Sequence, residues 1–352
     1  MTRAALAFSI TSLLPVPLIV AAALVGGAGV WAALLYVTLF AFMMDEVIAR
    51  AVPADRGGCE FPAHDALSVV LALAHFAVLG LTVHALAGGT GLGGAERLGL
   101  FLAAGLFLGQ VGNSNAHELI HRGRRGLNAL GRWVYISVLF GHHSSAHPLV
   151  HHRFVATDKD PNSARAGESY YRFARRAWIG SFKAGLTAER DRLRSIGRTG
   201  PLTNPYAVYF AGAALAVAAA AAIGGMAGIL AHLALSAFAQ SQLLISDYVQ
   251  HYGLRRGRLA DGRLEPVGPQ HSWNAPHWFT GHMMLNAPRH SDHHGHPARP
   301  YPALTLPSED RAPILPRSLP AMALLALWPR KWKQVMDPRV AAWTAAKDAQ
   351  AA

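Results

Sequence analysis

Four long runs without a charged residue are the feature of this sequence that most limits its fold. Each run is bounded by a pair of charged residues: Arg3 and Asp45, Asp65 and Glu96, Arg97 and Glu118, and Arg198 and Asp247. A helix that crosses the hydrocarbon core of a bilayer needs about 20 apolar residues. The first and last runs are long enough for two such helices each, and each middle run for one. The pattern therefore predicts an all-α integral membrane protein.

We expect six transmembrane helices within a single membrane-embedded domain that covers residues 1–352. Glycine-containing breaks at 26–29 and 224–228 divide the first and last runs in two. A cleaved signal peptide is disfavoured, because the first apolar run continues directly into a second span. The expected helices lie near residues 6–25, 30–44, 66–87, 98–116, 204–223 and 228–247.

The charge distribution predicts which side of the membrane each loop occupies. The short loops at 26–29, 88–95 and 224–227 are uncharged and rich in glycine. The charged segments are 45–65, the loop 117–203 and the tail 251–352, and residues 122–203 alone hold 15 Lys and Arg against 5 Asp and Glu. Because positively charged loops remain in the cytoplasm, these segments and both termini are expected there.

The single cysteine and the arginine-rich loop limit which partner molecules the chain is expected to have. Cys59 is the only cysteine, which excludes a disulfide framework and a thiolate-bound iron–sulfur cluster within this chain. Electrons for any redox reaction must then come from another protein. The arginine-rich loop lies next to predicted spans, where basic residues set topology and contact anionic lipid, so a nucleic-acid partner is not expected.

Two stretches of the tail have distinctive compositions. Residues 321–328 are apolar but too short to span a bilayer, and tryptophans and basic residues flank them. They are interpreted as a segment that lies on the lipid headgroups, or alternatively as a small buried patch. Residues 297–320 are rich in proline, so we expect them to be extended and irregular.

Nine of the 19 histidines fall into four clusters at the ends of, or between, the apolar runs. Three clusters use spacings of three or four residues, which place side chains on one helix face, so each would offer two or three imidazoles to a common point. Imidazole is a ligand for zinc, copper, iron and nickel. Since all four clusters fall on the predicted cytoplasmic side, the sequence predicts a centre of two metals held mostly by histidine at the membrane face. The clusters are His117 and His121; His147, His151 and His152; His251; and His290, His293 and His294.

Carboxylates close to these clusters are candidates for orienting the ligands, because ligating histidines usually donate their second N–H to a carboxylate or carbonyl. The candidates are Glu118, Asp158, Asp160, Asp247 and Asp292. No catalytic side chain beyond the metal ligands and no organic cofactor site is expected. The remaining histidines near the clusters are interpreted as structural or as outer neighbours of the ligands: His142, His143, His271, His277, His282 and His296.

Three other kinds of metal protein fit less well. The HELIH stretch has the spacing of a zinc protease motif, but a single zinc with three ligands would leave six clustered histidines unexplained. Carboxylate-bridged di-iron bundles need a set of Glu and ExxH motifs that this chain lacks. A metal transporter with a histidine-rich loop would need polar residues along its spans, and these spans have almost none.

The motifs together resemble the AlkB-type alkane monooxygenases of the membrane desaturase–hydroxylase group, over residues 113 to 345. The stretches HELIHR, HPLVHHRFVATDKDP and PRHSDHHGHPARPYPAL resemble that family's three histidine boxes, and QHYGL resembles its extra box. GESYYRF at 167–173, HSWN at 271–274 and VMDPRV at 335–340 are also similar to it. Two positions depart from the family pattern: Ala146 and Gln250 stand where the family usually has glutamate.

The resemblance implies a six-helix fold in a bacterial inner membrane and a di-iron site held by the nine clustered histidines. It also implies terminal hydroxylation of an alkane or similar apolar chain by O2, with electrons from a rubredoxin- or ferredoxin-type carrier and its reductase. Hydroxylation of a methyl group on an aromatic ring of the xylene type, and fatty-acyl hydroxylation or desaturation, are the alternatives within the same chemistry. Lipid is the remaining expected partner.

Overall fold

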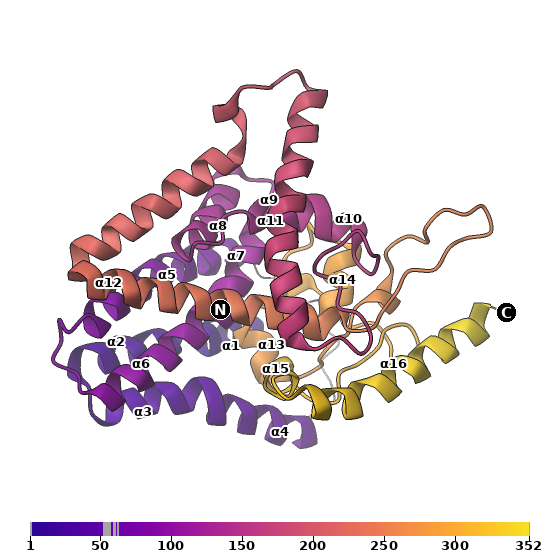
Figure 1. The fold of residues 1–352 in the computed structure, drawn as a ribbon. Helices are drawn as coiled ribbons and strands as arrows, with labels where there is room; N and C mark the ends of the chain where they lie inside the picture. Colours follow the sequence, from indigo (N-terminus) through magenta and orange to yellow (C-terminus); the bar gives the residue numbers. More distant parts are fainter. Residues whose placement is uncertain (1, 52–57, 59–60, 62, 352) are drawn as a thin grey trace.

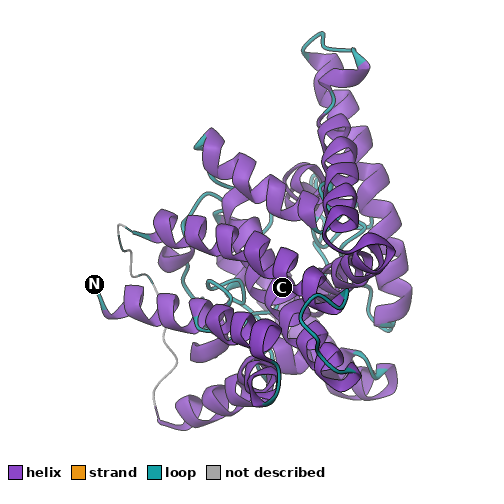
Figure 2. Cartoon of the chain, turned by 90° about the vertical axis from the view of Figure 1, so that its left-hand side faces the viewer, coloured by secondary structure: helices purple, strands orange, loops and turns teal. Residues whose placement is uncertain are grey.

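The computed structural model describes residues 2–51, 58, 61 and 63–351; Cys59 lies outside this set. Within the described residues the chain forms helices and loops, with no strand beyond two isolated bridges, Arg258 with Leu264 and Asn274 with Ile314. The all-α prediction is therefore confirmed. Figure 2 shows helices packed against one another and joined by loops.

The first three apolar segments form long helices. Residues 3–25 make α1 (Arg3–Leu13) and α2 (Pro15–Val25), which divide at Pro15 because proline has no N–H to continue the ladder. The second segment contains α3 (Ala28–Leu35), the π-helix η1 (Tyr36–Phe40) and α4 (Ala41–Ala51), and the third is α5 (His64–Leu86).

Two glycines make the turn between the first two segments. Gly26 and Gly27 have φ of 69° and 58°, in the left-handed region that favours glycine. The Glu96 carboxylate accepts a hydrogen bond from the Gly27 N–H at 2.6 Å, so the turn is fastened to the start of α6 (Gly94–Phe107), which follows later in the chain. α6 continues through the π-helix η2 (Leu108–Gly112) into α7 (Asn113–Ile120).

The last apolar run forms α12 (Pro205–His251), which folds back on itself. Gly224 and Gly225 have non-helical backbone angles, and the two arms correspond to the predicted helices 204–223 and 228–247. In Figure 1, α12 descends from the loop after α11, turns at the left edge of the molecule and returns across the middle of the view.

Among the described residues, four helical segments are long and apolar enough to cross a membrane: Arg3–Val25, Ala28–Arg50, His64–Leu86 and Pro205–His251. The prediction of six spans counts the two arms of α12 separately. It also counts one span formed by α6, η2 and α7, in which the π-helix η2 interrupts the α-helix.

The remaining elements are shorter or more polar. They include α11 (Tyr170–Ser195), which bonds to α12 through Tyr170 and Trp178 and whose upper end projects from the molecule in Figure 1. Residues 297–318 contain only one short 3-10 turn and are otherwise irregular. The other elements are α8 (Arg125–Ser137), α9 (His143–Ala146), the π-helix η3 (His147–His151), α10 (His152–Phe154), η4 (Pro201–Thr203), η5 (Pro269–His271), α13 (Trp278–Met283), α14 (His290–Gly295), η6 (Tyr301–Ala303), α15 (Leu319–Ala326) and α16 (Pro329–Ala351).

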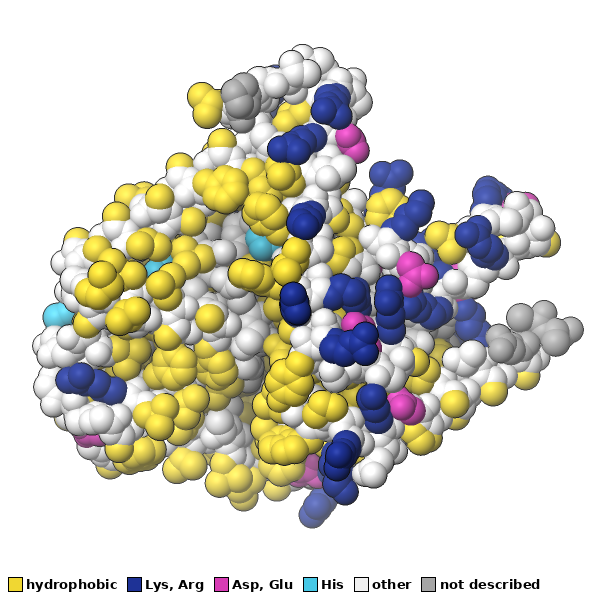
Figure 3. All heavy atoms as spheres, viewed as in Figure 1, with side chains coloured by type: hydrophobic (Ala, Val, Ile, Leu, Met, Phe, Trp, Pro, Cys, Tyr) yellow, Lys and Arg dark blue, Asp and Glu magenta, His cyan; other side chains and the backbone are white. Residues whose placement is uncertain are grey.

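The surface is divided between two kinds of side chain. Figure 3 shows apolar atoms covering the half of the molecule formed by the long helices, while lysine and arginine gather on the opposite half. Leu215, Met226 and Leu230 on α12 are 62%, 69% and 60% exposed. Apolar side chains this exposed, among apolar neighbours, are expected to face lipid.

Residues 321–328, the short apolar stretch of the tail, are interpreted above as lying on lipid or as a buried patch, and the structure has features of both. In α15, Leu319, Met322 and Ala326 are buried, whereas Leu324 and the following Trp328 are more than half exposed. One face of this short helix therefore packs on the protein and the other remains apolar and uncovered.

A glycine on α8 sets how closely that helix approaches α7, which carries the first histidine cluster. A Cβ on Gly131 would lie 2.6 Å from the Leu119 Cβ and 2.8 Å from the Ala116 carbonyl oxygen. We predict that Gly131→Ala lowers the free energy of unfolding by about 1–3 kcal/mol through overpacking, and reduces retained metal because α7 must move. Thermal unfolding in detergent and metal analysis would measure both effects. Gly126→Ala on the same helix is the control, since its Cβ would meet no atom within 4 Å.

Candidate metal centre

The nine clustered histidines come together in two groups. His117, His121, His147, His152 and His293 form a five-histidine group, and His151, His251, His290 and His294 form a four-histidine group. Within each group the potential ligand nitrogens all lie within 4.8 Å of one another. The side chains come from α7 and the residue after it, from η3 and α10, from the end of α12 and from α14.

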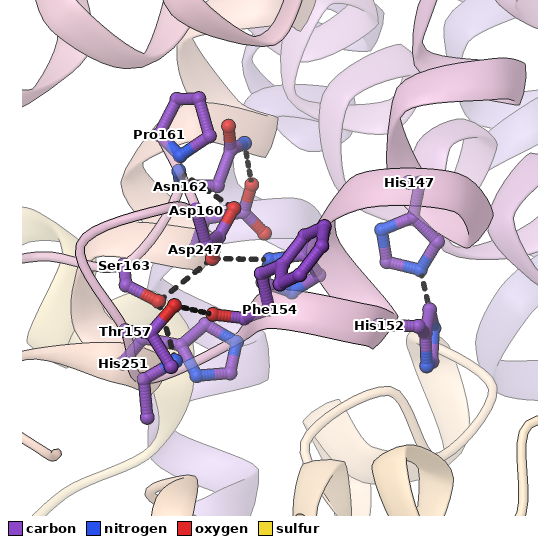
Figure 4. Close-up of polar contacts among 12 residues, drawn as sticks. His147, His152, Phe154, Thr157, Asp160, Pro161, Asn162, Ser163, Asp247 and His251 are labelled. Atoms are coloured by element: carbon purple, nitrogen blue, oxygen red, sulfur yellow. Dashed lines mark hydrogen bonds and ion pairs between the residues drawn. The ribbon is translucent and has the colours of Figure 1, made fainter. Parts of the chain in front are cut away.

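The structure corrects the expectation that each sequence cluster points to one common point. His151 and His152 are adjacent in sequence but belong to different groups, and so are His293 and His294. Consecutive residues of a helix face different directions, so one helical turn can serve both groups. In η3 the wider π-helical turn brings His147 and His152 together, with their Nε2 atoms 2.9 Å apart (Figure 4).

The spacing of the nitrogens fits a shared metal ion in each group. Bonds of about 2.0–2.1 Å to a common ion place neighbouring donor nitrogens roughly 3 Å apart. The Nε2 atoms of His117 and His147 are 2.8 Å apart, and those of His251 and His290 are 2.9 Å apart. The Nε2 atoms of His121 and His151 are buried and have no hydrogen-bond partner among the described residues, as expected of nitrogens that face an ion.

The electrostatic environment keeps most of these rings neutral. Burial, and then repulsion from neighbouring imidazoles, hold the pKa of His152, His293 and His294 well below the usual value. A neutral imidazole has the free lone pair that a metal bond requires. His151 differs: burial lowers its pKa, but the Asp160 carboxylate outweighs this effect, and the pKa is raised.

Asp160 is the one predicted carboxylate that contacts a clustered histidine among the described residues. Its Oδ2 lies 2.9 Å from Nδ1 of His151, and it also accepts hydrogen bonds from Ser163 Oγ at 2.7 Å and the Asn162 N–H at 3.0 Å. Asn162 in turn donates to Asp247 at 2.6 Å. Figure 4 shows this network beside His251, with Asp160 and Asp247 both pointing toward the histidines.

The other predicted carboxylates have different neighbours. Glu118 pairs with Arg122 and accepts the Tyr301 N–H, and Asp292 pairs with Arg299 and His296. Asp158 is exposed and lies near Arg255 at 3.2 Å. Glu118 and Asp292 therefore hold the loop after α14 in place instead of contacting a ligand ring, and Asp158 lies away from both groups.

A second chain of contacts supports His251 from the loop that follows it. Its Nδ1 lies 3.4 Å from the His271 carbonyl oxygen, and the His271 ring donates to Glu265 at 2.7 Å. Lys347 on α16 also pairs with Glu265. Partial burial alone would raise the pKa of the Glu265 carboxyl. Hydrogen bonds from Lys347, the Gly257 N–H and His271 outweigh this effect and lower the pKa to about 2.

This lowered pKa predicts a pH-dependent contribution of Glu265 to stability. A carboxyl with a lower pKa when folded stabilises the protein above its unfolded pKa of about 4.3, and the contribution disappears as the pH falls toward the folded value. We expect the melting temperature of the wild-type protein to exceed that of Glu265→Gln by roughly 2 °C at pH 6, with the gap closing toward pH 3. Exposed Glu309 is the control, and Glu309→Gln should leave the pH profile unchanged. A constant gap between pH 6 and pH 3 would contradict the prediction.

α14 is held by a buried polar network that the sequence did not reveal. Asn274 donates from its side chain to Ser291 Oγ and accepts the Ser291 N–H at 3.0 Å. Its backbone carbonyl accepts the Leu315 N–H at 2.7 Å, and the neighbouring Trp273 N–H donates to the Gln250 carbonyl at 2.8 Å. These contacts fix α14 against the end of α12, which places His290 opposite His251.

The histidines outside the two groups make local contacts. His75 bonds to Ser137 Oγ at 3.0 Å, His232 to the Ser137 carbonyl at 2.7 Å, and His142 to Ser181 at 3.3 Å. His143 is buried and lies between the aromatic rings of Tyr135 and Phe140 and the His147 ring.

The two departures from the family pattern have structural explanations. The Gln250 amide accepts from Ser246 at 2.8 Å and donates to the Ala287 carbonyl at 3.1 Å, and glutamate could not make the second bond. A Cβ on Gly185 would lie 3.0 Å from the Ala146 Cβ, so α11 packs directly against the small side chain at 146.

A cavity of about 70 Å³ lies against both groups of histidines. His117 and His147 of the five-histidine group and His290 of the four-histidine group are among the residues that line it. Its walls come from η2 and α7, from residues 242–250 of α12, and from α15. A molecule in this cavity would reach both metal positions.

Comparison with known proteins agrees with this geometry. Residues 96–325 match the fatty acid desaturase family. The chain is 34% identical over 255 residues to alkane 1-monooxygenase 2 of Pseudomonas aeruginosa, covering 72% of this chain and 67% of that protein. It is 36% identical over 247 residues to alkane 1-monooxygenase 1 of Alcanivorax borkumensis, covering 69% and 61%. A weaker match, 27% over 239 residues, is to the hydroxylase component of a xylene/toluene monooxygenase of Pseudomonas putida, covering 65% and 60%.

Proposed function

Because this chain belongs to the fatty acid desaturase family, we propose that it is a membrane monooxygenase that uses O2 to hydroxylate a terminal methyl group of an alkane or similar apolar chain. The observation that carries the proposal is the convergence of nine histidines into two groups that border one cavity. The names of the alkane 1-monooxygenase relatives support the same reaction, although the matched part covers only about two thirds of their length.

We propose that each group of histidines holds one iron ion. One ion would bind to the five-histidine group, which is His117, His121, His147, His152 and His293. The other would bind to the four-histidine group, which is His151, His251, His290 and His294. When bound, the two irons would supply the activation of O2 and the insertion of one oxygen atom into a C–H bond. The chain's own contribution is to fix the ligand rings, through Asp160 on His151 and the His271 carbonyl on His251.

The cavity walls would position the substrate. An apolar chain dissolves in the bilayer, and the walls at α12 and α15 belong to elements that also expose apolar faces such as Leu324 and Leu230. A chain that passes between these elements would place its methyl end beside His117 and His290. Exclusion of bulk water from this end would strengthen the electrostatic interactions there.

The electron donor would bind the basic half of the surface. Exposed cations are concentrated near the histidine groups and on α11, and we define the basic patch as Arg153, Lys159, Arg172, Arg175, Lys183 and Arg190. Figure 3 shows basic side chains gathered on this half of the molecule. An acidic carrier of the rubredoxin or ferredoxin type, reduced by its own reductase, would be steered to such a patch, with an association rate that falls as salt is added.

The proposed topology has six spans, with the two arms of α12 counted separately and the α6–α7 path included. The basic patch, the histidine groups and both termini would then lie on the cytoplasmic side of a bacterial inner membrane. This arrangement gives a soluble electron carrier access to the side on which the metals sit.

A panel of substrates with product identification tests the proposed reaction. Purified protein loaded with iron would be supplied with NADH, a carrier and its reductase, and offered n-alkanes, alkyl benzenes and fatty acyl esters. A primary alcohol from an alkane or similar chain is the expected product, with O2 consumed. Failure to hydroxylate any compound, with about two irons bound and the carrier reduced, would overturn the proposal.

Methyl groups on aromatic rings are the second candidate substrate, favoured by the match to the xylene/toluene monooxygenase component. The same panel separates the candidates, because a benzylic alcohol would replace the 1-alkanol as the main product. A fatty-acyl desaturase would instead yield an alkene.

A further inference from the structure

A second cavity, of about 630 Å³, lies where α11 ends and α12 begins. None of the clustered histidines is among the residues that line it. One wall is formed by the last turns of α11 and the loop that follows, and the other by the first turns of α12. Figure 1 shows these two helices joined at the upper end of the molecule. The volume is in the range of small-molecule sites, roughly 300–1,000 Å³, so this cavity is large enough to hold a ligand of its own.

Hydrogen bonds fix the two walls of this cavity. The buried Tyr206 of α12 donates from its hydroxyl to the Phe182 carbonyl of α11 at 2.9 Å, and the two rings also pack together. At the end of α11, Gly197 has a φ of 71°, and the Arg198 N–H donates to the Leu193 carbonyl at 2.9 Å. This turn ends the helix and leads the chain toward α12, so Arg198 lines the cavity although it lies beyond the helix.

The charged side chains that line this cavity are all positive. They are Arg190, Arg194 and Arg198, and no carboxylate is among the described residues of its walls. Arg194 lies 3.8 Å from Asp191, in a pair whose side chains are 71% and 67% exposed, so the pairing is weak. Neither Arg190 nor Arg198 forms an ion pair with another described residue. Guanidinium groups bind phosphate through paired N–H donors, so three of them around one cavity suit a phosphate group.

Apolar side chains lie beside these arginines. Leu186 and Phe210 line the same cavity, and Phe210 is 60% exposed. Leu202, in the loop that joins the two helices, is 85% exposed. Figure 3 shows basic and apolar side chains close together at this upper end of the molecule. A free anion has no group that could cover the apolar side chains, whereas an amphipathic molecule would contact both kinds.

The position of the cavity relative to the membrane limits the source of the phosphate. In the proposed topology the first arm of α12 enters the bilayer from the cytoplasmic side, and residues 204–210 are its first turns. The cavity would then lie at the level of the lipid headgroups. Anionic lipids make this surface negative and attract basic side chains that lie next to a span.

We infer that this cavity binds the headgroup of an anionic phospholipid. Arg190, Arg194 and Arg198 hold the phosphate, and an acyl chain lies along Phe210 and the first arm of α12. The inference depends on the membrane placement of α12 and not on the proposed reaction, since this lipid is bound without being a substrate. Because Arg190 also belongs to the basic patch defined above, the test uses the other two arginines.

Photo-crosslinking of the full-length protein in phosphatidylcholine nanodiscs tests the site. The nanodiscs would contain a trace of either phosphatidylglycerol or phosphatidylcholine with a diazirine on one acyl chain, and mass spectrometry would quantify labelled peptides from residues 182–212. We expect phosphatidylglycerol to label this segment in preference to phosphatidylcholine. Arg194→Gln and Arg198→Gln should each lower the ratio of the two yields about fivefold, and the double variant about 25-fold, since each basic side chain adds a similar attraction.

Two further double variants separate this site from general effects. Arg194→Lys with Arg198→Lys keeps both charges and should keep most of the preference, whereas a loss as large as with glutamine would show that charge is not the cause. Arg258→Gln with Arg263→Gln removes the same charge from an exposed loop and should leave the ratio unaltered. Equal labelling by the two lipids, a wild-type ratio in the double glutamine variant, or an equal loss in this control would overturn the inference.

Inorganic phosphate distinguishes a lipid headgroup from a free anion. Added at constant ionic strength, it should leave labelling by phosphatidylglycerol unaltered, because the acyl chain keeps the lipid at the cavity. Displacement of the lipid by phosphate would assign the arginines to a soluble anion and overturn the inference.

Discussion

Replacing His294 by alanine is expected to lower bound iron from about two ions per chain to about one and to reduce hydroxylation to background. His294 belongs to the four-histidine group, and its loss leaves three imidazoles in that group. The neighbouring His293 belongs to the five-histidine group, where four imidazoles would remain. His293→Ala should therefore retain close to two irons while losing most activity, because groups that act as a unit each account for nearly all of the rate.

Metal analysis and turnover assays of the purified His293→Ala and His294→Ala variants test this prediction. His296→Ala is the matched control, because His296 follows the same helix, is exposed and belongs to neither group. It should keep both ions and full activity. Equal metal loss in the His293 and His294 variants would show that the two groups do not bind separate ions in the way proposed here.

Replacing Asp160 by asparagine is expected to weaken metal binding at the four-histidine group by about 10–100-fold. The carboxylate holds Nδ1 of His151, and its negative charge makes the opposite ring nitrogen a stronger donor to a metal. Asparagine keeps the size of the side chain but not the charge. Activity should fall in parallel and should recover partly when iron is added in excess.

Asp158→Asn is the matched control for that experiment. Asp158 lies two residues away and was an equal candidate in sequence, yet its side chain is exposed and pairs with arginine. Iron affinity should be unchanged in this variant. An equal loss in both variants would indicate a general effect of charge and remove the special role of Asp160.

The apolar runs allowed the helical class and the approximate position of each long segment to be predicted from sequence. The absence of charge over a stretch longer than a membrane span constrains structure strongly, because an unpaired backbone cannot cross lipid. The same reasoning could not predict the π-helical turns at Leu108–Gly112 and His147–His151. Composition does not distinguish a π-helical turn from an α-helical turn. Packing against neighbouring helices determines which of the two forms.

The candidate histidines of the site could be identified in the sequence, but the group to which each histidine belongs could not. Helical spacing suggested that His147, His151 and His152 share a point, whereas contacts with α7, α12 and α14 determine which ring joins which group. Likewise, Asp158 and Asp160 are similar in sequence and separated by tertiary structure. Asn162, Ser163 and Asn274 carry no metal signature by themselves, so only the folded chain identifies them as supports of the histidines.

The fold-back of α12 at Gly224 and Gly225 has a consequence for how the protein is made. The two arms are joined without any polar stretch, and no charged residue separates Arg198 from Asp247. In the proposed six-span topology, no hydrophilic connection on the far side of the bilayer holds the first arm while the second is being synthesised. The arms should leave the translocon as one hairpin, so that His251 reaches its final depth only after both have been inserted.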